Sequence, residues 1–415
     1  MTTIDPLRLI DPACYAAHGY PHEEWRSLRR EAPLEHFDAP GWPSFWAVTK
    51  HADIVEISKQ PELFLNAPGM VLSREVPGRD PQQMQIRTII NMDPPDHRAY
   101  RAVASPYFTP RALKSLDPLV QDTARQLVDS LGDEGECDFI TDVASLHPLK
   151  VIARILGVPS SDEPFILKLT NELFGAEDPE FQRDEDRMQG LRSLFMEFWE
   201  YFGKIMQDRR QNPRDDLASV FANAKIDGEP MGELETMGYC LIAFTAGHET
   251  TRGSIGGGLQ ALLDFPEQRE RWARDPDLTA LAIDEIVRFV TPVNTMVRTA
   301  TQDYELRGRR IREGDKLVLF YASANRDEEI FESPDELVLD RNPNRHLGFG
   351  IGEHFCLGAH LARKTSGTLF RELLGRLEWV EPAGAPARTA SNLVPGIKHM
   401  PIRYRLRPSA QDHAA

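Results

Sequence analysis

The chain has 415 residues, with 48 lysines and arginines against 64 aspartates and glutamates, so its formal net charge is −16. This balance argues against nucleic acid as the main partner, because a nucleic-acid-binding surface needs basic residues to neutralise phosphates. The four cysteines form neither a zinc spacing nor a disulfide framework, which suits a reducing, cytoplasmic compartment. The segment Met1 to Pro6 has no basic start and no apolar core, so we expect neither a signal peptide nor a membrane anchor.

In chain order, short strands lie on either side of a helical middle. Apolar runs of strand length occur at Phe45 to Val48 and at Lys316 to Tyr321, and Tyr304 to Ile311 has the pattern of a hairpin. Long helical patterns occupy residues 111–131, 190–210, 232–264 and 357–377. We therefore predict a mainly α fold with a small β-rich lobe, made by about residues 30–60 and 295–325, and a helical remainder. No linker divides the chain, so we expect one domain over residues 1–415.

The first polar motif lies between Asp93 and Arg101, where a proline-rich turn precedes a helix that an aspartate is expected to cap. His97 and Arg101 are four residues apart and therefore share one face of this helix. Two cationic hydrogen-bond donors in this arrangement can hold a buried anion. Taken singly, each of them is more simply explained as a solvated charge.

A buried helix is predicted from Met237 onwards, because an apolar stretch that is too short to span a bilayer continues to Gly247. Gly247, Glu249 and Thr250 interrupt its apolar character, and such local conflicts often mark functional sites. The alternative is a threonine hydroxyl bonded to its own helix and a glutamate paired with Arg252.

Two charged residues, Glu285 and Arg288, lie at i,i+3 in a helix predicted from Leu278 to Val290. By itself, such a pair is an ordinary surface ion pair. Because the pair precedes the cysteine-containing loop, the other interpretation is that it supports this loop together with Arg341.

The most informative segment runs from Phe349 to Gly358 and delivers Cys356 from a glycine-rich loop to the start of a helical pattern. Glycines let the backbone pass close to a flat ligand, and a helix N-terminus favours the thiolate of a cysteine over its thiol. A small buried cysteine is the simplest alternative, but it does not explain the glycine spacing. A dinucleotide-binding fingerprint is disfavoured because the G-x-G-x-x-G spacing is absent.

This segment resembles the haem-binding signature F-x-x-G-x-x-x-C-x-G of the bacterial cytochromes P450, with every anchor present. The resemblance implies the P450 fold, with haem b buried between the long central helix and the cysteine loop. It also implies that Cys356 ligates the iron, with Phe349, Gly350 and Gly358 beside the haem. No C-x-x-C-H motif occurs, so covalent haem attachment is not expected.

The same resemblance assigns roles to three further groups of residues. Thr250 and Glu249 resemble the family's acid–alcohol pair, which delivers protons to dioxygen, while Gly247 leaves room for oxygen and lets the helix open locally. Four cationic residues match the donors to the haem propionates, namely His97, Arg101, Arg298 and His354. A buried scaffold near the haem is expected from Glu285, Arg288 and Arg341.

The implied activity is a monooxygenase reaction that consumes dioxygen and two electrons derived from NAD(P)H. No fused reductase is evident, so we expect a ferredoxin and a ferredoxin reductase to serve a monomeric enzyme. Basic residues expected on the cysteine side of the haem form a candidate docking surface for an acidic ferredoxin, with Arg101 turned inward: Arg98, Arg101, Arg111, Lys114, Arg363 and Lys364. A haem sensor or electron carrier and a peroxide-using peroxygenase or peroxidase are alternatives that the acid–alcohol pair disfavours.

The substrate is expected to be a small hydrophobic molecule, because the candidate pocket residues are mainly apolar and include no obvious anchor for a carboxylate. They are Leu72, Val76, Met84, Ile86, Phe174, Ile242, Ala243, Thr245, Val293, Met296 and Val394, for each of which core packing is the alternative. A weaker similarity to members acting on sterol side chains and terpenoids rests on Glu249 to Arg252, Tyr321 to Glu329 and Gly396 to His399, although Gly253 stands where those members usually have asparagine. We expect a steroid-like or terpenoid lipid, with a fatty acid, an aromatic compound or a polyketide intermediate as alternatives.

Overall fold

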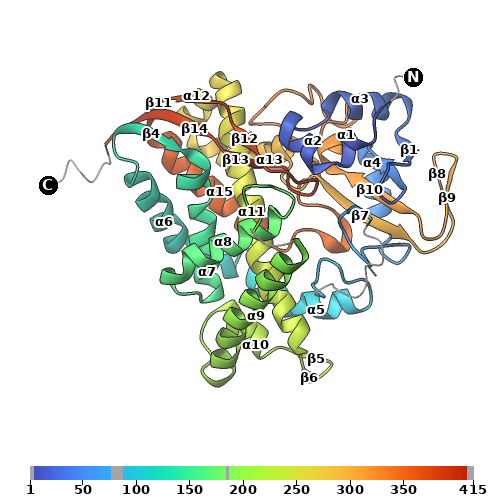
Figure 1. Ribbon diagram of the computed structural model, residues 1–415. Coiled ribbons are helices and arrows are strands. Elements are labelled where there is room, and N and C mark those ends of the chain that lie inside the picture. Colours follow the sequence, from blue (N-terminus) through green and yellow to red (C-terminus); the bar gives the residue numbers. More distant parts are fainter. Residues whose placement is uncertain (1–3, 76–86, 184–186, 409–415) are drawn as a thin grey trace.

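The computed structural model describes residues 4–75, 87–183 and 187–408. The fold is mainly helical, as predicted, with small sheets beside the helices (Figure 1). The longest helix, α11 (Glu233–Asp264), runs through the middle of the molecule. Helices α6 (Asp117–Asp129) and α7 (Leu146–Leu156) lie on one side of it, and the largest sheet lies on the other.

The helices follow the predicted pattern closely. The remaining α-helices are α1 (Leu7–Ile10), α2 (Pro12–His18), α3 (His22–Glu31), α4 (His51–Ser58), α5 (Asp96–Ala104), α8 (Glu163–Phe174), α9 (Arg187–Gln211), α10 (Leu217–Ala222), α12 (Pro266–Arg274), α13 (Thr279–Val290), α14 (Tyr321–Ala324) and α15 (Ala359–Arg376). Short 3-10 turns are η1 (Ser105–Phe108), η2 (Ala112–Leu116), η4 (Ser160–Asp162), η5 (Pro276–Leu278) and η6 (Gly352–His354), and η3 (Ile140–Ala144) is a π-helical turn. Among the described residues, no helix is both long and apolar enough to cross a bilayer.

The largest sheet has five strands in the order β1-β2-β10-β7-β3. Its strands are β1 (Leu34–Phe37), β2 (Phe45–Val48), β3 (Phe64–Leu65), β7 (Thr295–Ala300) and β10 (Lys316–Phe320). Strand β10 runs parallel to β2 and antiparallel to β7. All four residues of β2 are buried, which explains the continuous apolar run in its sequence. The predicted hairpin is present as β8 (Tyr304–Leu306) and β9 (Arg309–Ile311).

A second sheet, in the order β11-β14-β4, lies in the part of the chain predicted to be helical. Its strands are β4 (Glu134–Asp138), β11 (Leu377–Pro382) and β14 (Pro401–Leu406), and two-stranded pairs form from β5 (Lys225–Ile226) with β6 (Glu229–Pro230) and from β12 (Ala387–Arg388) with β13 (Ile397–His399). Strand β4 is mainly exposed and acidic, so its own sequence gives no strand signal. Its conformation depends on pairing with β14, far away in the chain.

The C-terminal half of α11 packs closely against its neighbours. A Cβ atom on Gly257 would lie 2.5 Å from Val290 Cγ1 of α13, and one on Gly258 would lie 2.8 Å from Phe370 Cζ of α15. Glycine permits these approaches because it has no side chain. The result is one hydrophobic core that joins α11, α13 and α15 and fixes the position of the central helix.

Candidate active site

The cysteine loop is a tight turn that ends just before α15. The Cys356 N–H donates to the Phe349 carbonyl at 2.8 Å. Gly350 and Gly352 have φ angles of 68° and 77°, in the left-handed region that favours glycine. A side chain on Gly352 would also collide with the Ser58 carbonyl oxygen. The glycines recognised in the sequence are therefore required by the turn that presents Cys356.

Cys356 and the middle of α11 line one large cavity. Phe349, Gly350, Cys356 and Gly358 contribute from the loop, and Ala246, Gly247 and Thr250 contribute from α11. The centres of water molecules can reach about 230 Å³ of this space. The cavity therefore brings together two segments that lie about a hundred residues apart in the sequence.

The chemistry of the cysteine differs from the expectation based on the helix N-terminus. Burial raises the pKa of the Cys356 thiol, against the lowering effects of the Gly358 backbone and of Arg101 and Arg363. The helix and these cations are therefore not sufficient to favour the thiolate. A metal ion bonded to the sulfur would stabilise the thiolate directly.

Four cationic residues predicted from the sequence gather at one side of the cavity. Arg101, Arg298 and His354 line it, and the ring of His97 stacks on His354 with centroids 4.0 Å apart. His97 is 1% exposed, yet both of its ring nitrogens lack a hydrogen-bond partner within the described chain. The predicted aspartate cap of α5 is not formed, because Pro95 occupies the cap position and Asp96 is the first helical residue.

The electrostatics of this cluster suit a bound anion. Burial, together with His97, Arg298 and Arg101, lowers the pKa of His354 to about 2. Burial and the Arg101 charge also lower the pKa of His97, against the raising effect of Glu353, whose Oε2 lies 3.7 Å from His97 Nδ1, and burial lowers the pKa of Arg101. Crowded donors with unpartnered nitrogens are costly unless an anion joins them. The two carboxylates of a haem fit this requirement, so the residues present are suited to the group.

The acid–alcohol pair on α11 makes the structural contacts that were considered as the alternative to a catalytic role: a threonine bonded to its own helix and a glutamate paired with Arg252. The Thr250 hydroxyl donates to the Ala246 carbonyl at 2.7 Å. The Glu249 carboxylate is 1% exposed and pairs with Arg252 through one oxygen, while its other oxygen is buried without a partner within the described chain. Burial raises the pKa of Glu249, and Arg252 opposes this shift. Thr250 lines the cavity, but Glu249 does not.

The helix around Gly247 does not open locally, in contrast to the expectation. The helix is continuous through this position, and the Gly247 carbonyl accepts from the Thr251 hydroxyl at 3.0 Å, so no local opening is present. A Cβ atom on Gly247 would lie 3.1 Å from Ile152 Cδ1 of α7. The missing side chain therefore also serves the packing of α11 on α7.

The predicted scaffold residues form a network in which Glu285 and Arg288 are fully buried and Arg341 is partly buried. Arg288 donates to both oxygens of Glu285 at 2.7 Å, and Arg341 Nε lies 3.1 Å from both. Arg288 also donates to the carbonyls of Asn325 and Pro334 on the segment that leads towards the cysteine loop. The surface ion pair considered for Glu285 and Arg288 is thus wrong, since both side chains are 0% exposed.

A family model described as Cytochrome P450 matches residues 43–404, which include all of these segments. The chain belongs to the cytochrome P450 family. It is 41% identical over 402 residues to cytochrome P450-terp of Pseudomonas sp, covering 93% of each chain. It is 37% identical over 389 residues to the methyl-branched lipid omega-hydroxylase of Mycobacterium tuberculosis, covering 91% of this chain and 90% of the relative.

Steroid-acting and structurally defined relatives are also similar. The steroid C26-monooxygenase of Mycolicibacterium smegmatis is 36% identical over 393 residues, covering 92% of this chain and 90% of the relative. The structure of a Mycobacterium marinum cytochrome P450 in complex with pseudoionone superposes with a TM-score of 0.88 at 34% identity, covering 97% of this chain and 99% of that chain. These matches confirm the P450 fold and the assignment as a P450 monooxygenase.

The candidate pocket residues of this P450 divide into three groups. Ile242, Ala243, Val293 and Met296 line the cavity. Leu72, Phe174, Thr245 and Val394 do not, and Leu72 instead packs in the core beneath the N-terminal helices. Val76, Met84 and Ile86 lie outside the described residues.

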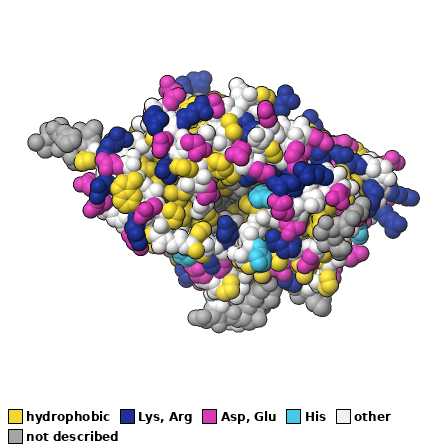
Figure 2. Space-filling view, turned by 90° about the horizontal axis from the view of Figure 1, so that it is seen from above, with side chains coloured by type: hydrophobic (Ala, Val, Ile, Leu, Met, Phe, Trp, Pro, Cys, Tyr) yellow, Lys and Arg dark blue, Asp and Glu magenta, His cyan; other side chains and the backbone are white. Residues whose placement is uncertain are grey.

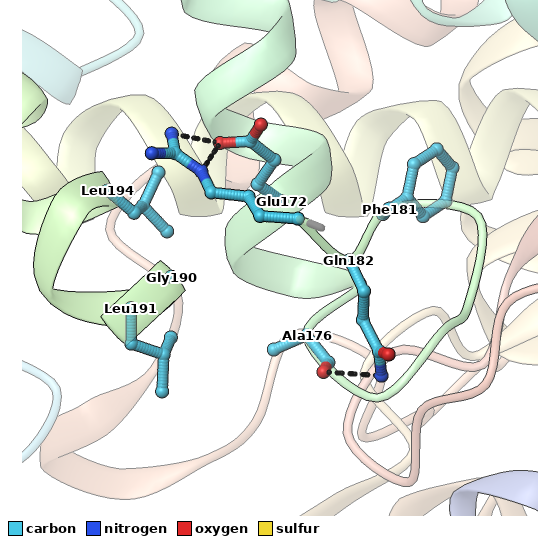
Figure 3. A pocket seen from close by; sticks show the side chains of 8 residues that line it. Glu172, Ala176, Phe181, Gln182, Gly190, Leu191 and Leu194 are labelled. Atoms are coloured by element: carbon cyan, nitrogen blue, oxygen red, sulfur yellow. Dashed lines mark hydrogen bonds and ion pairs between the residues drawn. The ribbon is translucent and has the colours of Figure 1, made fainter. Parts of the chain in front are cut away.

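Several residues that line the cavity were not predicted as pocket residues from the sequence. Ile89, Ile90, Pro292 and Asn66 line the cavity, although no motif contains them, and Tyr321 lines it although its motif was not predicted to contribute to the pocket. They come from segments distant in the chain, and only the packing brings them together. A smaller pocket between the end of α8 and the start of α9 contains Glu172, Leu191 and Leu194 but none of the predicted site residues (Figure 3).

The arrangement assigns a physical task to each group of residues in a P450. When bound, haem with a thiolate ligand supplies the iron chemistry that activates dioxygen. Arg101, Arg298 and the two histidines would hold its carboxylates, and Cys356 would hold its iron. The walls of the cavity are mainly apolar, and Thr250 is the cavity-lining polar residue of α11 that directly follows a buried acid, Glu249.

Proposed function

We propose that this P450 hydroxylates a C–H bond of a steroid-like or terpenoid substrate. The observation that carries the proposal is the character of the cavity lining: its charged residues within the described chain are Arg101 and Arg298, which the haem carboxylates would occupy. Elsewhere in the lining, as far as residues 4–75, 87–183 and 187–408 form it, no charged group is present to anchor a substrate carboxylate. A neutral, apolar molecule therefore fits better than a free fatty acid.

Relatives whose names or bound ligands identify a substrate support the same direction. One is named a steroid C26-monooxygenase and another a methyl-branched lipid omega-hydroxylase, and a Bacillus megaterium relative of 28% identity was solved in complex with testosterone. Fatty acids, aromatic compounds and polyketide intermediates are the alternatives and are included in the test, together with the branched lipids that the second relative suggests.

We assign the catalytic roles to the residues predicted from the sequence. Cys356 is the iron ligand, and Thr250 with Glu249 provides the route for protons. Because Glu249 pairs with Arg252, its carboxylate must exchange that partner, or pass a proton through its free oxygen, to serve the cavity. Electrons would come from a separate ferredoxin and ferredoxin reductase in the cytoplasm.

Two spectroscopic measurements test this proposal. The reduced protein with carbon monoxide should show the strongly red-shifted Soret band of thiolate ligation, and its absence would overturn the haem-thiolate assignment. A panel of steroids, terpenoids, branched lipids, fatty acids, aromatic compounds and polyketides should then be screened for the shift to high spin. No response to any steroid or terpenoid, with a response to another class, would overturn the substrate preference.

A further inference from the structure

Thr291 ends α13 in a backbone conformation that is unfavourable for its side chain. Its φ angle is 45° and its ψ angle is 71°, in the left-handed region. Among the described residues, it is the only β-branched residue with a positive φ. Such a conformation is strained, and strain of this kind persists only where the surrounding structure holds it, often beside a functional site. Thr291 is 1% exposed and directly precedes Pro292 and Val293, which line the cavity.

Hydrogen bonds from three separate segments hold Thr291 in this conformation. Its hydroxyl donates to the Arg288 carbonyl at 2.7 Å and accepts from Asn325 Nδ2 at 2.8 Å. Its own carbonyl oxygen accepts from the Tyr20 hydroxyl at 2.9 Å. Glycine is the usual residue at such a helix end, but glycine has no hydroxyl group and cannot make the first two bonds. Threonine at this position therefore adds backbone strain but supplies the contacts that fix the turn between α13 and β7.

The Asn325 side chain links this turn to the segment that leads into the cysteine loop. Asn325 is 0% exposed, and its Oδ1 accepts from the Leu347 N–H at 2.7 Å. Because a backbone N–H can only donate, this bond identifies the amide oxygen and leaves Nδ2 as the donor to Thr291. Leu347 also lines the cavity and lies two residues before Phe349, where the cysteine loop begins. One buried side chain therefore joins two walls of the same cavity.

We propose that Thr291 and Asn325 are positioning residues that determine specificity, because they hold the cavity wall at Pro292 and Val293 in a fixed place relative to the cysteine loop. The proposal rests on the proposed function, in which this cavity holds the substrate, and deepens it. Met296 also lines the cavity and follows from the same turn in β7. A wall that is fixed in advance selects a rigid molecule whose shape matches it, such as a fused-ring steroid or a cyclic terpenoid.

The test compares the binding of two ligands to the ferric haem enzyme, measured by the shift of the Soret band. Imidazole is too small to report the position of a wall, whereas clotrimazole is rigid and carries three aromatic rings on one carbon. Thr291→Val keeps the shape of the side chain but loses the hydroxyl. It should change the ratio of the two dissociation constants by roughly fivefold, about the effect of one lost hydrogen bond. Thr291→Ser keeps the hydroxyl and should keep the ratio.

Asn325→Ala removes the same link from its other side. It should change the ratio in the same direction as Thr291→Val. The double variant should change the ratio by no more than the larger single change, because both residues act through one contact. Additive effects of the two changes would overturn the proposed link.

Thr170→Val is the matched control for lost stability. Thr170 is 0% exposed and its hydroxyl donates to the Ile166 carbonyl at 3.0 Å, but none of the residues of α8, all of which the structure describes, lines the cavity. This variant should lower thermal stability and leave the ratio unchanged. An unchanged ratio in Thr291→Val would overturn the proposal, and so would an equal change in Thr170→Val.

Crystal structures of the two Thr291 variants separate this proposal from the proposed function. The distance between the Cα atoms of Val293 and Cys356 can be measured without haem or ligand. We expect this distance to differ from that of the unchanged protein in Thr291→Val and to be the same in Thr291→Ser. An unchanged distance in Thr291→Val would overturn the proposal whatever the haem content. Absence of thiolate-ligated haem would instead overturn the proposed function.

Discussion

Thr250 illustrates how little separates a structural from a chemical role at the scale of one residue. Its hydroxyl donates to the Ala246 carbonyl, as many helical threonines do, but the residue also lines the cavity. A hydroxyl rotates at small cost and can exchange that helical bond for a partner in the cavity. The neighbouring Glu249 is less free, because Arg252 holds one of its oxygens.

The Thr250→Ala variant should uncouple electron use from product formation. Without the hydroxyl, proton delivery is impaired, so more peroxide is released and the yield of product per reductant consumed falls by about tenfold or more. The measurement is the ratio of product and peroxide to consumed reductant.

Thr236→Ala is the control, since Thr236 makes the same kind of bond to the Gly232 carbonyl of α11 but does not line the cavity. Its coupling should equal that of the unchanged enzyme. Equal coupling in Thr250→Ala would remove Thr250 from the proton route.

At the scale of the element, the glycines of α11 determine how closely helices approach. Gly257 leaves room for Val290, and this contact holds α13, which carries the buried Glu285 and Arg288. The close packing therefore links the central helix to the network beneath the cysteine loop.

Gly257→Ala should destabilise the protein by about 1–3 kcal/mol, because the added methyl group overpacks the contact with Val290. Chemical denaturation of the two proteins measures the difference. Gly203→Ala in α9 is the control: a Cβ there meets nothing within 4 Å, so alanine should stabilise the helix by up to about 1 kcal/mol. A Gly257→Ala protein as stable as the Gly203→Ala protein would contradict the packing argument.

A second element-scale feature is the attachment of the α8–α9 connection to β13 and β4. His399 of β13 lies between Asp138 of β4, at 2.5 Å, and Glu180, at 2.8 Å. Burial favours neutral His399, but the two carboxylates outweigh it and raise the pKa of His399 above 6.5. The adjacent Lys398 pairs with Asp178 at 2.7 Å.

This geometry gives a pH-dependent contribution to stability. A raised pKa in the folded state stabilises the fold below the unfolded pKa of about 6.5, and the contribution is lost as the pH rises through the folded value. His399→Gln should therefore be less stable than the unchanged protein at about pH 5.5 and similar to it at about pH 9, as measured by denaturant unfolding.

Lys398→Gln provides the comparison for this pH series. The pKa of Lys398 is raised further above 10.5 by Asp178 and Glu180 despite burial, so its charge does not change over this range. Its effect should be nearly independent of pH. A His399→Gln difference that grows with rising pH would have the wrong sign and would exclude the carboxylate contacts as its cause.

At the scale of the whole molecule, the formal net charge is −16. Figure 2 shows acidic and basic side chains interspersed over the visible face. Among the six basic residues of the candidate docking surface, Arg98, Arg363 and Lys364 pair with Glu353, Asp284 and Asp117, respectively. Arg111 and Lys114 are exposed and have no ion-pair partner within the described chain. We therefore restrict the candidate ferredoxin-docking surface to Arg111 and Lys114, which lie at η2.

Reversal of both charges, Arg111→Glu with Lys114→Glu, should slow ferredoxin-driven reduction by about tenfold at low salt and by much less at high salt, because the attraction is screened. Stopped-flow reduction measures the rates. Arg312→Glu, an exposed position after β9, should leave them unchanged. If the double variant kept its rate at low salt, this docking surface would be wrong.

The sequence by itself determined the features that depend on neighbouring residues. The glycine spacing around Cys356, the long helical pattern of α11 and the apolar run of β2 are local, because turns, helices and buried strands each impose a short-range pattern. These patterns were sufficient to predict the mainly α fold and the family.

Only the tertiary structure decided which side chains meet across the chain. It places Leu72 in the core beneath the N-terminal helices, outside the candidate pocket, and Asn66 beside His354 and Arg298. It also pairs the acidic segment of β4 with β14 in a sheet. The physical reason is that strand register and helix packing set these distances, and neither is encoded in the periodicity of a single segment.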